Sequence, residues 1–112
     1  MNCIFCKIIN GDIPSKIVAE SSNYIAIKDI NPVSPVHILI IPKEHIEKPG
    51  ELAKFDGKIL QELFELVEEV ARSENIFDSG YRLIVNSGKD AGQEVAHLHW
   101  HLLGGRKLGK LG

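Results

Sequence analysis

Hydrophobic positions recur at steps of three and four residues along one segment of the chain, and they alternate or run together in several others. The helical spacing covers residues 55–71, and charged side chains fill the opposite face of that segment. This pattern predicts one long amphipathic helix whose charges are solvated surface. A shorter apolar segment at residues 3–9, followed by Asn10 and Gly11, predicts a short N-terminal helix.

Five segments have the alternation or the continuous apolar runs that are typical of β-strands. The most apolar of them, at residues 36–41, should end at Pro42. The other four are expected at residues 17–20, 24–29, 81–86 and 95–105. Strands and helices do not alternate regularly, so we predict an α+β fold in a single domain spanning residues 1–112. It should have a five-stranded antiparallel sheet, one long helix and a short N-terminal helix.

The last predicted strand contains three of the five histidines, at positions 97, 99 and 101. A strand places every second side chain on the same face, so all three imidazoles would share one face and Leu98 and Trp100 the other. A helix would spread the histidines around its axis, and no common site would form. Imidazole can act as a nucleophile, transfer protons or bind metal, so this row predicts a reactive site. The alternative is an ordinary half-buried strand with a histidine-rich polar face.

Composition narrows the classes of protein that remain. A chain of 112 residues with 44% hydrophobic and 25% charged residues is typical of a soluble globular protein. A net charge of −2 offers no basic excess for neutralising nucleic-acid phosphates. The longest apolar run is too short to cross a membrane, and the first residues lack the layout of a signal peptide. We therefore expect a cytoplasmic protein whose Cys3 and Cys6 are reduced.

The histidine segment, His97-Leu-His-Trp-His-Leu-Leu103, resembles the signature of the histidine triad (HIT) superfamily, in which three histidines alternate with apolar residues. Further segments resemble its histidine triad nucleotide-binding branch: residues 4–9, 12–14, 29–30, 37–43, 80–82, 86, 92–93 and 104–106. The resemblance runs nearly end to end and implies an HIT-like fold. It also implies a homodimer whose sheets join across the subunit boundary. The implied activity is cleavage of the P–N bond of adenosine or other purine nucleoside 5′-phosphoramidates.

This resemblance assigns catalysis to the triad itself, with His99 as the nucleophile that forms a nucleotidyl-histidine intermediate. The chemistry agrees, because a neutral imidazole can attack phosphorus if its other ring nitrogen has an acceptor, for which a backbone carbonyl is expected. His101 would contact the phosphoryl oxygens or help to protonate the leaving amine. His97 would complete the triad at its other end.

The resemblance also implies the groups that bind the nucleotide. Asp29 would accept hydrogen bonds from the ribose hydroxyls, although it could simply cap a turn at a strand end. His37 would support the triad, or it is a polar strand terminus. Asn86 and Gln93 are candidate donors to the phosphoryl oxygens, with a strand-end turn and a solvated loop as alternatives. The walls of the base pocket, which could equally be ordinary core, are Ile4, Phe5, Ile8, Ile27 and Ile30.

A second constellation points to a metal. Cys3 and Cys6 have the spacing of half a zinc site, and a redox pair is the alternative. The resemblance supplies His45 and His97 as the two remaining ligands, in a closed structural zinc site. That site would tie the N-terminal helix to the histidine strand.

Two other functions remain open from the sequence. One is hydrolysis of dinucleoside polyphosphates, and the other is binding of purine nucleotides by a regulator without turnover. At position 94 some members of the family have a serine that contacts the phosphate or leaving group. Glu94 stands there in this chain. A carboxylate repels phosphate, so we leave Glu94 out of catalysis, and its presence puts the preferred leaving group in doubt.

Overall fold

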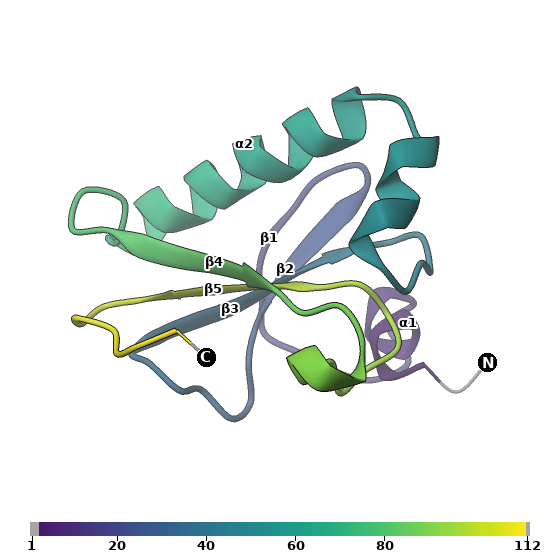
Figure 1. Cartoon of the computed structure of the whole chain (residues 1–112). Coiled ribbons are helices and arrows are strands. Elements are labelled where there is room, and N and C mark those ends of the chain that lie inside the picture. Colours follow the sequence, from purple (N-terminus) through teal and green to yellow (C-terminus); the bar gives the residue numbers. More distant parts are fainter. Residues whose placement is uncertain (1–2, 112) are drawn as a thin grey trace.

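The computed structural model describes residues 3–111, and strands within this range form a five-stranded sheet. The strands are β1 (Ile17–Glu20), β2 (Tyr24–Lys28), β3 (Val36–Pro42), β4 (Tyr81–Val85) and β5 (Trp100–Gly104). Their order across the sheet is β1-β2-β3-β5-β4, and all neighbouring pairs are antiparallel (Figure 1). The predicted α+β antiparallel architecture is therefore confirmed.

The long helix, α2, spans Lys58–Ser73 and starts three residues later than the hydrophobic spacing predicts. Phe55 is extended at the end of a preceding 3₁₀ helix, and the Asp56 carboxylate accepts a hydrogen bond from the backbone N–H of Lys58 at 2.9 Å. An acceptor at that place satisfies a free N–H of the first helical turn, which explains the later start. The other helical segments are α1 (Ile4–Ile9), η1 (Pro49–Lys54) and η2 (Lys89–Ala91).

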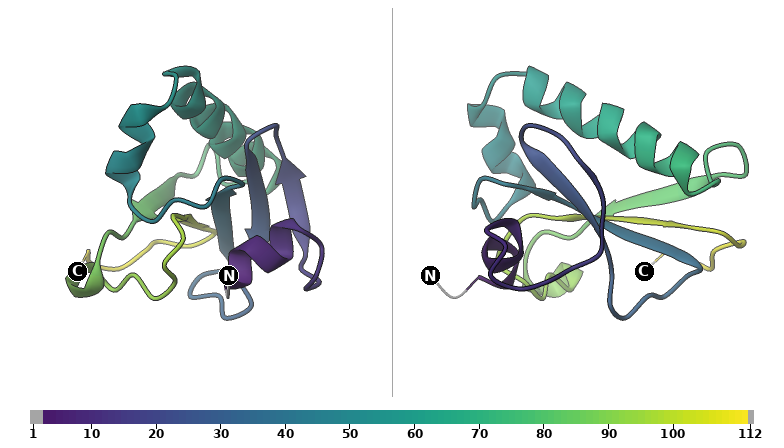
Figure 2. Two further views of the ribbon diagram at one scale, coloured as in Figure 1. Left: turned by 90° about the vertical axis from the view of Figure 1, so that its right-hand side faces the viewer. Right: turned by 180° about the vertical axis from the view of Figure 1, so that it is seen from behind.

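The two faces of the sheet pack against different helices, with α2 on one side and α1 on the other in both views of Figure 2. Side chains of β3 divide between them by strict alternation. Ile38 and Ile40 belong to the core beneath α2, whereas Leu39 and Ile41 belong to the core beside α1. Burial on both faces explains why the sequence of β3 is an almost continuous apolar run.

The histidine strand is shorter than the predicted residues 95–105, because β5 begins only at Trp100. Trp100 pairs with Val85, which is the last residue of β4, so no further partner continues the ladder on that side. The preceding chain bonds to a loop instead, and the backbone N–H of Leu98 donates to the carbonyl of Ile46 at 2.7 Å. His97 and His99 thus lie in an irregular segment that leads into β5.

Among residues 3–111, no helix is both long enough and apolar enough to span a lipid bilayer.

Candidate active site and metal centre

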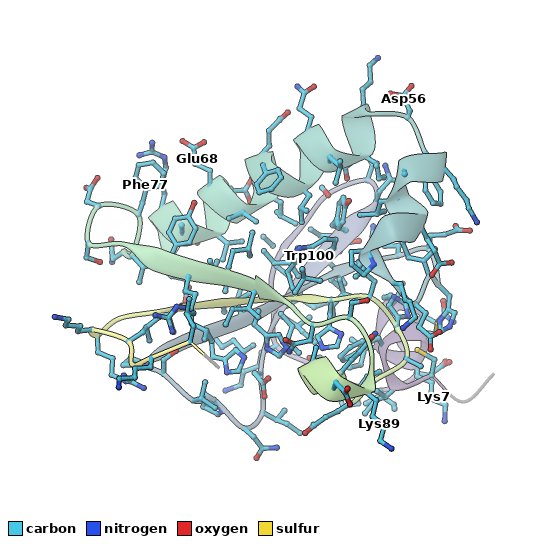
Figure 3. All side chains as sticks on the ribbon, in the orientation of Figure 1. Lys7, Asp56, Glu68, Phe77, Lys89 and Trp100 are labelled. Atoms are coloured by element: carbon cyan, nitrogen blue, oxygen red, sulfur yellow. The ribbon has the colours of Figure 1, made fainter. Side chains whose placement is uncertain are left out.

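The alternation predicted for the histidine segment persists although half of the segment lies outside the strand. Leu98, Trp100 and Leu102 all pack into the core beneath α2, and Figure 3 shows Trp100 on the α2 side of β5. The aromatic ring of Phe5, from α1 on the opposite side, contacts the rings of His97 and His99. The three histidines therefore lie on the α1 side of the sheet.

A cavity of about 630 Å³ opens on this side, which is a volume typical of small-molecule sites. Ten residues singled out from the sequence line it: Ile4, Phe5, Ile8, Ile27, Asp29, Ile30, His37, Asn86, His99 and His101. Phe5 and Ile27 are buried in the core beside α1 and also line the cavity. They can therefore be both core residues and walls of a base pocket. Ile30, in contrast, is 86% exposed at the rim.

His99 is held by one backbone group. Its Nδ1 lies 2.8 Å from the carbonyl oxygen of His97, so Nδ1 must carry the proton that it donates to this acceptor. In the neutral ring this leaves Nε2 unprotonated, with a lone pair, on a ring that lines the cavity. The nitrogen of a neutral imidazole with such a lone pair is a nucleophile.

The tautomer of His101 is fixed by a series of hydrogen bonds that begins in the loop before β3. The backbone N–H of Val33 donates to Nδ1 of His37 at 3.2 Å, so Nδ1 is the unprotonated nitrogen and Nε2 carries the hydrogen. That Nε2 lies 2.9 Å from Nδ1 of His101 and 3.3 Å from a carboxylate oxygen of Asp29. His37 therefore donates to Nδ1 of His101, which leaves the hydrogen of His101 on Nε2.

Burial favours the neutral forms of His37 and His101. It lowers the pKa of His101 to about 4, and the neighbouring His99 and His37 act in the same direction. Burial also lowers the pKa of His37, although the Asp29 carboxylate opposes the shift. At neutral pH both rings therefore act as hydrogen-bond donors and acceptors and not as cations.

Two predicted residues lie outside the cavity wall. His97 packs beneath it with Cys3 and Cys6, as described below. Gln93 shapes the adjacent loop: its side chain accepts from the backbone N–H of Gly88 at 2.8 Å and donates to the carbonyls of Glu47 and Val95. Its amide groups thus have partners within the protein, and it fastens the loop that contains η2.

The cavity also has lining residues that the sequence did not single out for binding. Glu94 is among them, together with Gly92 and Val95 of the same loop. Lys28, Asp29 and Glu94 are the charged side chains of the described wall, so carboxylates outnumber cations there. Lys89, from the same loop, points outward in Figure 3. Glu94 was left out of catalysis because a carboxylate repels phosphate, yet it lies in the cavity wall.

The four predicted metal ligands do come together. Sγ of Cys3 and Cys6 and one nitrogen each of His45 and His97 all lie within 4.8 Å of one another. Nδ1 of His97 is 3.3 Å from Cys3 Sγ, 3.6 Å from Cys6 Sγ and 3.0 Å from Nδ1 of His45. Neighbouring ligands on a tetrahedral zinc ion are separated by about 3.3–3.8 Å, a range that both His97–cysteine distances match, whereas the two imidazole nitrogens lie closer together. This cluster could therefore hold a metal ion.

The surroundings of the cluster fit that role. Nε2 of His97 lies 2.8 Å from the carbonyl of Pro42 and must donate to it, which turns the lone pair of Nδ1 toward the thiols. Burial, and then the neighbouring Cys3, raise the pKa of the Cys6 thiol. A dication would supply the positive charge that two adjacent thiolates require. Both cysteines are free of disulfides.

Comparisons with known proteins agree with this geometry. The sequence profile of the HIT domain matches residues 10–108. The chain is 43% identical over 108 residues to a purine nucleoside phosphoramidase of Escherichia coli strain K12, covering 96% of this chain and 91% of that protein. Two solved structures resemble it closely. They are a HIT family hydrolase from Clostridium thermocellum (TM-score 0.92, 51% identity, 98% and 96% of the two chains covered) and a HIT family hydrolase from Legionella pneumophila (TM-score 0.90, 42% identity, 96% of each chain covered).

Proposed function

The chain belongs to the HIT domain family, and on this premise we propose that it hydrolyses the P–N bond of purine nucleoside 5′-phosphoramidates through a nucleotidyl-histidine intermediate. One observation supports this most directly. The Nδ1 proton of His99 is engaged by the carbonyl of His97 at 2.8 Å, so the Nε2 lone pair belongs to a ring on the cavity wall. The phosphoramidase from Escherichia coli, at 43% identity, favours the same reaction.

In the first step, Nε2 of His99 attacks the α-phosphorus, and the bond from phosphorus to the amine nitrogen breaks. The new bond makes the His99 ring cationic, and the carbonyl of His97 stabilises this charge through Nδ1–H. With its pKa at about 4, His101 is neutral at pH 7 and donates a hydrogen bond to a phosphoryl oxygen. The departing nitrogen takes its proton from solvent. Water then attacks phosphorus, releases the monophosphate and restores neutral His99.

The remainder of the nucleotide would occupy the cavity. The carboxylate of Asp29 already accepts from the backbone N–H of Asn31 at 2.8 Å, and its oxygens retain lone pairs for the ribose hydroxyls. Apolar side chains of α1 and β2, among them Phe5 and Ile27, would enclose the purine base. Gln93 was predicted to donate to the phosphoryl oxygens, but its amide groups already have partners within the protein, so we propose instead that it holds the loop that contains η2.

The charges of the cavity wall favour a phosphoramidase over a dinucleoside polyphosphate hydrolase. Asp29 and Glu94 face a single lysine, Lys28, in the described lining. A leaving nucleotide of a dinucleoside polyphosphate has several negative charges and would be repelled, whereas a leaving amine is neutral or cationic. We therefore expect faster turnover of an adenosine phosphoramidate than of a diadenosine polyphosphate. Glu94→Gln should narrow this ratio.

We expect His99→Ala to abolish phosphoramidate turnover while purine monophosphate still binds. Comparable turnover of the two substrates by the unmodified chain would contradict the preference. Tight nucleotide binding without any turnover, unchanged in His99→Ala, would instead support a regulator.

The metal in this proposal is zinc, held by Cys3, Cys6, His45 and His97. Two thiolates and two imidazoles are a ligand set that zinc prefers, and four protein ligands close the site. Such a zinc ion is structural. Reduced thiols are also consistent with the cytoplasm that we expect for the protein.

We also propose a homodimer. β4 is an edge strand, and its Tyr81 and Val85 are 39% and 38% exposed. On α2, Leu60 and Phe64 are also exposed apolar side chains. Pairing of two β4 edges would cover unpaired backbone groups and apolar surface together. Sedimentation of Phe64→Glu should then show a shift toward the monomer, and a monomeric unmodified chain would contradict the proposal.

A further inference from the structure

The chain after β5 folds back against the loop that precedes β3, and two contacts fasten it there. Gly105 has a φ of +94°, and a Cβ atom at this position would lie only 2.8 Å from Cβ of Pro35. Next to it, Nη2 of Arg106 donates to the carbonyl of Val33 at 3.0 Å. In Figure 1 the yellow C-terminal segment lies beside the start of β3. The backbone can approach Pro35 this closely because residue 105 is glycine.

Val33 is held from both of its peptide groups. Its carbonyl accepts from Arg106, and its N–H donates to Nδ1 of His37 at 3.2 Å. His37 is buried and contacts His101, which lines the cavity. A continuous series of hydrogen bonds therefore connects an exposed arginine of the tail with a histidine of the triad. Arg106 itself is not among the residues that line the cavity.

These contacts determine which ring nitrogens of His37 and His101 carry a hydrogen. An N–H aimed at Nδ1 of His37 permits only the neutral tautomer with hydrogen on Nε2. That hydrogen is donated to Nδ1 of His101, whose own hydrogen must then be on Nε2. If Val33 moved away, His37 could hold its hydrogen on either nitrogen, and His101 would lose the contact that fixes its tautomer.

We propose that Arg106 is a positioning residue of the triad: by anchoring the carbonyl of Val33, it keeps the N–H of Val33 on His37 and so sets the tautomer of His101. The expected effect of Arg106 on turnover rests on the function proposed above. Its effect on the tautomers of His37 and His101 does not depend on any substrate.

A purely structural role for Arg106 is the competing explanation, and the chain offers a matched control. Arg82 also donates from a guanidinium to a backbone carbonyl of the tail, that of Gly109, at 3.0 Å. Gly109, unlike Val33, has no described contact with His37 or His101. If Arg106 only fastened the tail, Arg82→Ala and Arg106→Ala would have the same effects.

The test combines imidazole nitrogen NMR of the full-length, metal-loaded protein with steady-state kinetics on an adenosine phosphoramidate. In the unmodified protein His37 and His101 should both have hydrogen on Nε2 alone. Arg106→Ala should yield a tautomer mixture at both rings and lower kcat by on the order of tenfold with little change in KM, because misplacement of a catalytic group impairs the reacting geometry. Arg106→Lys should restore part of both, and Gly105→Ala, which displaces the tail by another route, should resemble Arg106→Ala. Arg82→Ala should leave tautomers and kcat unchanged.

Unchanged tautomers in Arg106→Ala would overturn the inference, as would an equal effect in Arg82→Ala. If the tautomers shift as expected but the unmodified protein turns over no phosphoramidate, the positioning role of Arg106 is supported and the proposed function is the part that fails.

Discussion

Within residues 3–111, two clusters gather side chains of the kind that bind metals, and one of these two has hydrogen bonds that favour a metal. The first cluster is Cys3, Cys6, His45 and His97, and the second is Asp29, His37 and His101. In each, the ligand atoms lie within 4.8 Å of one another. Residue type and proximity therefore do not distinguish them.

The two clusters differ in the backbone group that bonds to the ring nitrogen pointing away from the cluster, on His97 in the first and on His37 in the second. The Pro42 carbonyl, 2.8 Å from Nε2 of His97, accepts a hydrogen bond and leaves Nδ1 free to coordinate. The Val33 N–H, 3.2 Å from Nδ1 of His37, donates a hydrogen and therefore requires Nε2 to be protonated. A metal on Nε2 of His37 would need a hydrogen on Nδ1, facing another donor. A backbone carbonyl on one ring nitrogen thus leaves the other nitrogen free to bind a metal. A backbone N–H instead makes the other nitrogen a hydrogen-bond donor.

The largest expected effect comes from breaking the first cluster. Cys6→Ser should lose stoichiometric zinc and lower Tm by about 10 °C or more, because a structural zinc site contributes several kcal/mol to folding in a chain of this size. Metal analysis and thermal melts of the purified protein measure both effects. An unchanged zinc content would show that the ligand set is wrong.

Breaking the second cluster should produce the opposite pattern. His37→Ala should retain zinc and Tm within a few degrees but lower kcat by about 10²-fold, since His101 loses the partner that orients it. The two variants can be compared in the same metal and turnover assays. Loss of one equivalent of zinc in His37→Ala would mean that the second cluster is a metal site after all.

The smallest expected effect is on stability in acid. Burial lowers the pKa of His101 from an ordinary value of 6.5 to about 4, so between these pH values the unfolded chain binds a proton that the folded chain does not. The free energy of unfolding should therefore fall as pH decreases from 6.5 toward 4, with a slope of up to about 1.4 kcal/mol per pH unit from this residue. Denaturant titrations should show a shallower slope for His101→Asn. An equal slope in both proteins would remove His101 as the source.

The hydrophobic pattern of the sequence predicted the antiparallel sheet and both α-helices, because the continuous apolar run of β3, the alternation in β5 and the helical spacing of α2 are imposed by burial on the sheet faces. The boundaries of the elements depend on contacts that the hydrophobic pattern does not contain. β5 begins at Trp100 because its neighbour β4 ends at Val85, which depends on a partner distant in sequence. Pro49 begins a 3₁₀ helix, η1, that no hydrophobic spacing marks.

Some residues of the candidate site could likewise be predicted from the sequence, and others depend on the fold. The triad and the Cys3–Cys6 pair are local patterns, and a short motif is enough to find them. Val33 bonds to His37 and to Arg106 through its backbone N–H and carbonyl. Every residue type except proline has both groups, so the sequence does not mark these two contacts. Glu94 enters the cavity wall through the fold of the η2 loop, which polar and glycine residues leave undetermined at the level of sequence.

The central claim, that Nε2 of His99 bonds to phosphorus, is tested most directly by rapid quenching of the protein with an adenosine phosphoramidate, followed by mass spectrometry of its peptides. We predict a nucleotidyl adduct on His99 that disappears on further incubation and is absent from His99→Ala. An adduct on His101 or His97, or turnover without any adduct on His99, would contradict the account.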